Sequence, residues 1–400
     1  MDVLDQWLWR QEYWLPPGIS WEDMRGMEGS HIPLPRDLFL CLPLAFSFIA
    51  IRFVFERHVA VPLSRYLGVK DRKRLAATPS PKLEAFYIEH RRRQPAQGEI
   101  TVLMKQTGFT QRRVEVWFRR RRDQDRPSST KKFCEACWRF VFYMISFTAG
   151  LASLISTPWF WDQRECWRGY PQQPVENVHY WYYLFELGFY WSLLLCVSVD
   201  VKRKDFKEQI IHHFATIFLL GFSYCSNYIR VGTLVMLVHD SSDFLLESAK
   251  MFNYAGWKKT CDSLFVVFAV MFLVTRLVIF PSKIIHTTLV LSMERFQPFV
   301  GYYFFNALLL VLQMLHMFWA WLILRMVYKF LFLGKLDKDE RSDEESEVEE
   351  DDCDEEEQPS WVKREVMLNS KLTMLTSSCV LNNLTHQRAN SSCNTLPKSR

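Results

Sequence analysis

Long apolar runs constrain this 400-residue chain more than any other feature of its sequence. A run of about 18 apolar residues is long enough to cross the hydrocarbon core of a bilayer as an α-helix. Aromatic residues make up 16% of the chain and gather around these runs, as in interfacial belts. The sequence therefore predicts an all-α, polytopic membrane protein with about seven transmembrane helices. The runs are residues 38–55, 138–155, 180–199, 210–224, 228–246, 264–280 and 302–324.

The loop charges predict the orientation of these helices. Lys and Arg are dense after the first, third, fifth and seventh runs and sparse after the second, fourth and sixth. Because positive residues concentrate on the cytoplasmic side, this alternation fits seven spans. It predicts a lumenal amino-terminal segment over residues 1–35, a first transmembrane helix over residues 36–56 and a cytosolic carboxyl terminus.

The carboxyl-terminal segment, residues 335–400, is predicted to be an acidic, disordered cytosolic tail. Residues 337–357 are dominated by Asp and Glu, and a block of like charges repels itself. Ser342 and Ser346 lie among these acids and are candidates for phosphorylation by acid-directed kinases. The alternative interpretation is a solvated tail without a regulatory role.

A basic segment between the first two runs, residues 75–128, predicts a small helical domain in the cytosol. Thr110 is suited to cap the last helix of this domain. That helix resembles the recognition helix of a homeodomain, with its W-F-x-N-R-R signature. Arg120 stands where a homeodomain has the Asn that grips adenine, and Arg cannot accept a hydrogen bond. We therefore expect a degenerate homeobox-like domain of structural or regulatory use, whose positive charge attracts anionic lipid head groups, and a membrane-tethered DNA-binding regulator is the less favoured alternative. In this last helix Val114, Trp117 and Phe118 are expected to pack inward. The first helix carries Leu83, Phe86, Tyr87 and Ile88 on or near one face, and the second contains Ile100, Leu103 and Met104.

Ionisable residues inside two of the runs indicate a functional site, because such residues are costly in a membrane. His212 and His213 begin the fourth run, and Asp240 and Asp243 lie near the end of the fifth. Successive helices run in opposite directions, so we expect these two groups at a similar depth. The two acids share a helix face at a spacing of three residues. The adjacent histidines point about 100° apart, so only one is expected to face a given pocket.

A histidine near a carboxylate is the basic unit of acyl-transfer chemistry. The carboxylate orients the imidazole, which then deprotonates an attacking amine or itself attacks a thioester. The competing interpretation is that these side chains only hold the helices together. The sequence leaves open which histidine reacts and whether it becomes acylated.

Several stretches of the chain together resemble the ceramide synthase family. They are the opening W-L-P-P of residues 14–17, the homeobox-like segment, residues 202–256 with H-H-F and H-D-S-S-D-F-L-L-E-S-A-K, and the tail motif R-S-D-E-E-S. The resemblance implies a six-helix TLC acyltransferase domain over residues 131–332, in addition to the amino-terminal span. It also implies a multi-pass protein of the endoplasmic reticulum that forms homo- or heterodimers with family members.

The resemblance further implies transfer of an acyl chain from a fatty acyl-CoA to sphinganine or sphingosine. His212 and His213 would then be catalytic, with Asp240 and Asp243 in support. Acyl-CoA is a co-substrate, so no cofactor is expected. No metal is expected either, because the single C-x-x-C pair, Cys134 and Cys137, lacks further ligands.

Basic residues precede the histidine pair and could hold the phosphates of CoA, although they also satisfy the positive-inside rule unaided. They are Lys202, Arg203, Lys204 and Lys207. We expect the acyl chain in a long apolar cavity among the spans. The link of residues 292–299 lies where family members vary in acyl-length preference. The main alternative is a non-enzymatic TLC-domain protein, such as a lipid sensor or a translocon-associated factor, which would not need both histidines and both acids.

Overall fold

The computed structural model describes residues 7, 9–25, 33–71, 74–90, 93–202 and 205–333. These residues form helices and connecting turns, without a strand among them, so the all-α prediction is confirmed for this part of the chain. The acidic tail, with Ser342 and Ser346, lies outside the described residues, as do Arg203 and Lys204.

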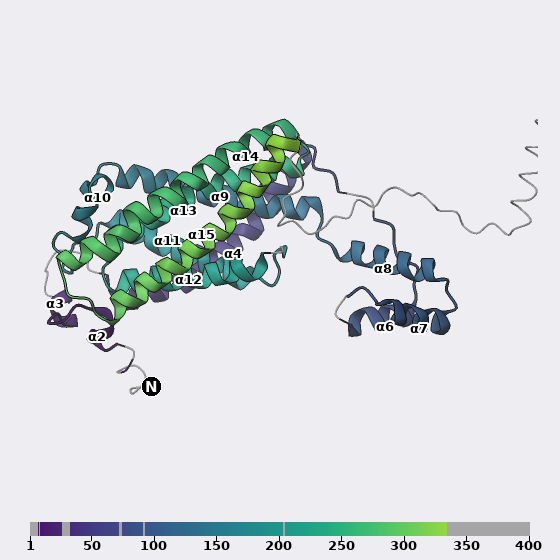
Figure 1. Ribbon diagram of the computed structural model, residues 1–400, viewed down its shortest axis with the longest axis horizontal. Helices are drawn as coiled ribbons and strands as arrows, with labels where there is room; N and C mark the ends of the chain where they lie inside the picture. Colours follow the sequence, from purple (N-terminus) through teal and green to yellow (C-terminus); the bar gives the residue numbers. More distant parts are fainter. Residues whose placement is uncertain are drawn as a thin grey trace, which may run out of the picture. The chain divides into compact units, whose positions relative to one another are not determined.

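A helix occupies each of the seven positions at which the sequence predicts a span (Figure 1). Four stretches are long and apolar enough to cross a membrane, namely Pro35–Tyr66, Gln111–Leu154, Lys258–Glu294 and Val300–Phe332. The three helices in between carry more polar, Tyr and Trp side chains, so the count of seven spans stays a prediction. The seven helices are α4 (Cys41–Phe55), α9 (Ser129–Leu154), α11 (Asn177–Cys196), α12 (Phe206–Cys225), α13 (Ile229–Tyr254), α14 (Lys258–Phe272), continued by the π-helix η4 (Leu273–Ile285), and α15 (Val300–Leu333).

The seven helices pack as one bundle around α13. This helix lies against α9 on one side and against α14 and η4 on the other, while α11 packs on α4 and α12 packs on α15. Aromatic rings fill much of the interior, and the rings of Phe142 and Phe189 stack with centroids 3.5 Å apart. This arrangement brings the beginning of α12 and the middle of α13 to the same region of the bundle.

Short helices flank the bundle and connect its parts. They are α2 (Gln11–Trp14), α3 (Trp21–Arg25), η1 (Pro35–Leu40), η2 (Glu56–Ala60), α5 (Val61–Tyr66), α10 (Pro158–Trp161), η3 (Gln163–Trp167), η5 (Thr287–Leu291) and η6 (Ser292–Glu294).

The basic segment forms a three-helix unit of α6 (Pro81–Glu89), α7 (Gln97–Thr107) and α8 (Gln111–Asp125). Thr110 caps α8 as predicted, because its side chain accepts a hydrogen bond from the backbone N–H of Arg113. Ile88 differs from the expectation and is 67% exposed, because it lies about 100° beyond the buried Tyr87 on α6. The core consists of Leu83, Tyr87, Ile100, Leu103, Val114, Trp117 and Phe118, with Phe86 and Met104 packed against it.

A glycine on α13 permits a close approach of three helices. A Cβ atom added at Gly232 would lie 1.5 Å from the Tyr183 hydroxyl oxygen and 2.7 Å from Cζ of that ring. Tyr183 is fully buried on α11, and its hydroxyl lies 3.1 Å from the Ser223 hydroxyl on α12. The ring therefore has no room to retreat, and small residues at such crossings are typical of membrane helix packing.

We expect Gly232→Ala to destabilise the bundle by about 1–3 kcal/mol, because the added methyl group overpacks a closed contact. The melting temperature of the purified protein in detergent measures this effect. Gly221→Ala is the matched control, since a Cβ atom on Gly221 of α12 meets nothing within 4 Å. Equal melting temperatures for the two variants would contradict the close-approach argument.

Candidate functional site

A polar cavity of about 100 Å³ lies among α9, α11, α12, α13, α14 and α15. Three of the four predicted catalytic residues line it, namely His212, His213 and Asp243. The fourth, Asp240, lines an adjoining apolar cavity. The fold thus brings the histidines of α12 and the acids of α13 to neighbouring walls of two cavities.

Both histidines face the polar cavity, which corrects the expectation that only one of them would face a given pocket. The cavity is wide enough to take in two sides of α12, so a separation of about 100° does not exclude either ring. Their ring centroids lie 5.8 Å apart. His212 also packs edge-on against Trp319 of α15, at 5.4 Å, and His213 packs against Tyr190 of α11, at 5.8 Å.

Asp243 is held by an arginine from the next helix. Arg276 Nη2 lies 2.6 Å from Asp243 Oδ1 and donates a second hydrogen bond, of 2.9 Å, to the backbone oxygen of His239. Its Nε donates to the Ser242 hydroxyl at 3.2 Å. The Arg276 side chain is only 3% exposed, so this ion pair fixes η4 against α13 from inside the bundle.

Asp240 is held by groups from two other helices. Ser146 Oγ of α9 lies 2.7 Å from Asp240 Oδ2 and also contacts the carboxyl group of Glu186 on α11. The Tyr182 hydroxyl lies 3.5 Å from the same Asp240 oxygen. One hydroxyl therefore joins two buried carboxyl groups from different helices.

A second histidine pair lies beside His212. His239 of α13 places its ring centroid 6.1 Å from that of His212, and its Nε2 lies 3.0 Å from Nε2 of His316 on α15. His239 Nδ1 lies 2.7 Å from the backbone oxygen of Val235, which can only accept, so Nδ1 carries the proton. A neutral His239 then accepts at Nε2 from the Nε2–H of His316. The geometry thus assigns one tautomer to each ring of this pair.

Neither predicted catalytic histidine is hydrogen-bonded to a carboxylate in the part of the chain that the structure describes. Nδ1 of His212 and Nδ1 of His213 are both buried without a hydrogen-bond partner. The two acids are instead engaged by Ser146 and Arg276. Each imidazole can therefore take up a proton or attack a carbonyl carbon without first releasing an internal partner.

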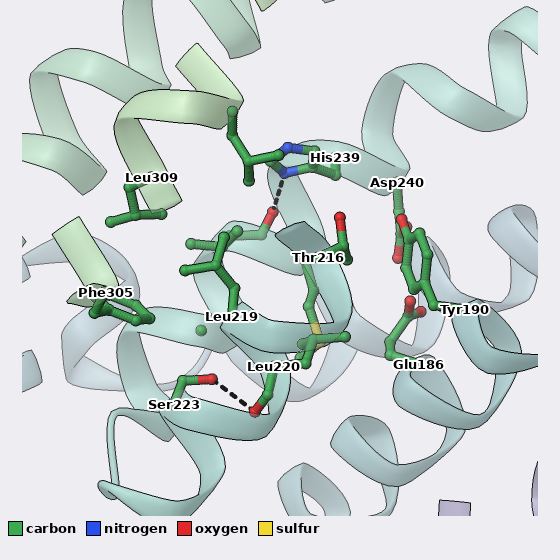
Figure 2. A pocket seen from close by; sticks show the side chains of 14 residues that line it. Glu186, Tyr190, Thr216, Leu219, Leu220, Ser223, His239, Asp240, Phe305 and Leu309 are labelled. Atoms are coloured by element: carbon green, nitrogen blue, oxygen red, sulfur yellow. Dashed lines mark hydrogen bonds between the residues drawn. The ribbon is translucent and has the colours of Figure 1, made fainter. Parts of the chain in front are cut away.

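The adjoining apolar cavity is walled by aliphatic and aromatic side chains of α12, α13 and α15, including Leu219 and Phe305 (Figure 2). Figure 2 shows Glu186, Asp240 and Tyr190 together on one side of this cavity, while Ser223 lies on another. Its volume is about 30 Å³, room for about two water molecules and far less than a long acyl chain needs.

A much larger apolar groove follows the carboxyl-terminal half of α12. It measures about 610 Å³ and is bordered by side chains such as Trp14, Phe222 and Phe304. Gly301, just after the link of residues 292–299, also lines it. Apolar walls therefore accompany α12 from the histidines to its far end, a distance of about 20 Å at 1.5 Å per residue.

The two described basic residues before the histidine pair, Lys202 and Lys207, are exposed. Lys202 places its Nζ 5.3 Å from the Phe206 ring centroid, and Lys207 lies in the first turn of α12. Among the described residues, no group of three His, Cys, Asp or Glu side chains is arranged to hold a metal ion. Cys134 and Cys137 are buried thiols of α9.

Four further residues of the site were not predicted from the sequence, although three of them carried a signal. Arg276, His316 and Glu186 are ionisable residues within predicted spans, and the rule that singles out Asp240 applies equally to them. Ser146 gives no comparable signal, because an isolated serine in an apolar run is common and its partners are distant in the sequence.

Comparisons with known proteins agree with this architecture. The family model of the TLC domain matches residues 132–325, which include every helix of the bundle except α4. Ceramide synthase 4 of Bos taurus is 49% identical over 85% of this chain and 86% of its own length. Ceramide synthase 4 of Homo sapiens is 49% identical over 89% of each chain. Ceramide synthase hyl-1 of Caenorhabditis elegans is 31% identical over 84% of each chain.

The stretch matched by the family model contains the residues that line both cavities and the positions of all four predicted catalytic residues. With nearly half of the residues identical over more than four fifths of both chains, the chain belongs to the ceramide synthase family.

Proposed function

We propose that this protein transfers a long or very long acyl chain from acyl-CoA to the amine of sphinganine or sphingosine, giving dihydroceramide or ceramide and free CoA. The observation that carries this proposal is the pair of buried imidazoles in one polar cavity, directly beside apolar space, in a member of the ceramide synthase family. A thioester and an amine can meet there while their hydrocarbon chains lie against apolar walls.

His212 is the group that reacts in this proposal. Its ring is oriented by the edge-on contact with Trp319 and by the neighbouring His239, and its Nδ1 has no internal partner. Acting as a base, it takes a proton from the amine as the C–N bond forms. Acting as a nucleophile, it forms an acyl-imidazole with release of CoA, and the amine then displaces the imidazole. His213 orients the site through its contact with Tyr190.

Asp243 and Asp240 support the reaction in different ways. Asp243 fixes the charge and position of Arg276, which also holds the backbone of His239. Asp240 lies on the wall of the apolar cavity, next to the place where an amine would arrive. The exposed Lys202 and Lys207 are suited to attract the phosphates of CoA toward α12.

The location of the protein in the cell and its orientation in the membrane are also proposed. The loop charges support seven spans in the endoplasmic reticulum membrane, with a lumenal amino terminus and a cytosolic carboxyl terminus. The three-helix unit, with Arg120 in place of the adenine-binding Asn, suits a homeobox-like domain beside anionic lipids rather than on DNA. Dimers with other family members and phosphorylation at Ser342 and Ser346 complete the proposal.

We expect His212→Ala to lower the rate of sphinganine acylation by at least 100-fold, because general base catalysis typically contributes about 10²–10⁴-fold. The measurement is product formation by purified protein with sphinganine and a panel of acyl-CoAs. His58→Ala is the matched control, since His58 is exposed on η2, and it should leave the rate unchanged. Full activity of His212→Ala would end the assignment of His212 as the reacting group.

The same preparation distinguishes the two roles of His212. Protein incubated with acyl-CoA alone should gain the mass of one acyl group on the peptide that contains His212 if the imidazole is the nucleophile. A protein that needs His212 for activity but gains no such mass uses it as a base.

We expect Arg276→Leu to lower the free energy of unfolding by about 3 kcal/mol, because it leaves the Asp243 carboxylate without its buried cation. The double variant Arg276→Leu/Asp243→Asn should regain most of this loss, since no unpaired charge remains. It should still be inactive, because the hydrogen bond from Arg276 to the backbone of His239 is lost. Melting in detergent and the acylation assay measure the two effects. If the double variant melts no higher than Arg276→Leu, the ion pair is not what fixes η4 to α13.

A further inference from the structure

Glu186 and Asp240 form a carboxyl pair on the wall of the apolar cavity. Glu186 comes from α11, Asp240 from α13, and both residues are only 1% exposed. Ser146 Oγ of α9 contacts both side chains. Figure 2 shows Glu186 and Asp240 close to each other and to the Tyr190 ring, on one side of the cavity.

The hydroxyl between them limits where the protons lie. Ser146 carries one hydroxyl proton and can donate it to only one carboxylate at a time. Its second contact is favourable only if the other carboxyl group is protonated and donates to the serine oxygen. The arrangement therefore suits a pair that shares one proton and keeps one negative charge.

That remaining charge has no counter-ion. Within the described part of the chain, no Lys or Arg nitrogen lies within ion-pair distance of Glu186 or Asp240, whereas Asp243 is paired with Arg276 and Asp200 with Arg52. In addition, Glu186 Oε2 and Asp240 Oδ1 are buried without a hydrogen-bond partner outside the pair. A buried carboxylate without a cation is costly, so a pair with one uncompensated charge beside a cavity indicates a cationic donor that arrives from outside.

We propose that Glu186 and Asp240 bind the ammonium group of the sphingoid base and remove one of its protons, an inference that rests on the proposed function. A primary alkyl amine resembles the Lys side chain, whose ordinary pKa is about 10.4, so it arrives as an ammonium ion that has no lone pair for attack. The aliphatic walls of the cavity suit the start of its hydrocarbon chain.

The proton balance of the step is simple. One N–H bond of the ammonium breaks and the proton passes to a carboxylate oxygen, which leaves a neutral amine. The amine lone pair then forms the C–N bond with the acyl carbon, while the bond to sulfur or to the imidazole breaks. A second N–H proton leaves as the amide forms and is taken up by His212 or by the departing thiolate.

The position of the pair allows this transfer. Tyr190 lines the same cavity, and its ring centroid lies 6.4 Å from that of His212. Thr216, one turn after His212, also lines the cavity, and its hydroxyl donates to the backbone oxygen of His212 at 2.8 Å. Tyr190 and Thr216 therefore connect the wall that carries Glu186 and Asp240 with His212 on the wall of the polar cavity.

The test compares Glu186→Gln with wild type in steady-state kinetics that vary each substrate in turn. The amide keeps the size of the side chain but loses the negative charge. We expect the KM for sphinganine to rise at least 10-fold and kcat to fall, while the KM for acyl-CoA stays within twofold. Glu89→Gln is the matched control, because Glu89 is exposed at the end of α6.

A second readout distinguishes substrate binding from a structural role. A sphinganine analogue with two fluorine atoms on the carbon next to the amine-bearing carbon has a much less basic amine, so a far larger fraction of it arrives neutral. The ratio of wild-type to Glu186→Gln activity should fall at least 10-fold with this analogue. A purely structural Glu186 would lower the melting temperature and the activity on both amines alike, and that result overturns the inference.

The outcomes also separate this inference from the proposed function. Wild-type protein that forms no amide refutes the proposed function and this inference together. Active wild type with an unchanged KM for sphinganine in Glu186→Gln overturns the inference alone. If Glu186→Gln does not fold, Ser146→Ala replaces it, since it keeps both acids and removes only the bridging hydroxyl. We then expect a several-fold rise in the KM for sphinganine, and an unchanged value contradicts the proposal.

Discussion

The ion pair between Arg276 and Asp243 is the contact on which the arrangement of the site depends. A guanidinium that is 3% exposed would be very costly without a carboxylate, and here it also holds the backbone of His239 and the hydroxyl of Ser242. These bonds join η4 to the turn of α13 that carries His239, Ser242 and Asp243. The position of His239, and through its ring that of His212, follows from this connection.

The absence of water inside a bilayer explains why the polar groups of the bundle occur in sets. A buried donor or acceptor is satisfied by the protein or by a bound substrate, because hydrocarbon offers no partner. Ser146 meets two carboxyl groups, and His239 meets both a backbone oxygen and His316. Each set draws its members from two or three helices. Chemistry and packing are therefore specified together, and a helix that shifted would lose hydrogen bonds as well as apolar contacts.

The sequence allowed much of the fold to be predicted, for physical reasons that are visible in particular residues. Apolar runs located the seven long helices, because length and hydrophobicity act locally along the chain. Thr110 could be identified as a cap from its own position, since capping involves only the next three residues. The boundaries were less accurate. Helix α12 begins at Phe206, four residues before the predicted run, because charged residues can continue a helix beyond its apolar part.

The candidate site could be predicted only in part, because its contacts join residues that are distant in the sequence. His212, His213, Asp240 and Asp243 stood out as ionisable residues in apolar runs, and the fold brings them to two adjoining cavities. Their partners did not follow from the pattern. The expected hydrogen bond between a catalytic histidine and an acid is absent among the described residues, since Arg276 and Ser146 engage the acids instead. Which acid meets which base depends on helix rotation, which periodicity alone does not fix.

The two acids of α13 have different electrostatic surroundings, and this difference bears on how the site could work. Asp243 has a permanent cation in Arg276, so its charge is balanced before any substrate binds. Asp240 and Glu186 share a hydroxyl contact, and no Lys or Arg nitrogen among the described residues lies within ion-pair distance of either. A cavity whose charge is incomplete until a cation arrives favours an ammonium over a neutral lipid of the same length. The apolar walls alone would not distinguish the two, because hydrocarbon contacts depend on area and not on charge. Selection of an amine among the many lipids of a membrane therefore requires a buried charge of this kind, on a wall that the reacting imidazole can reach.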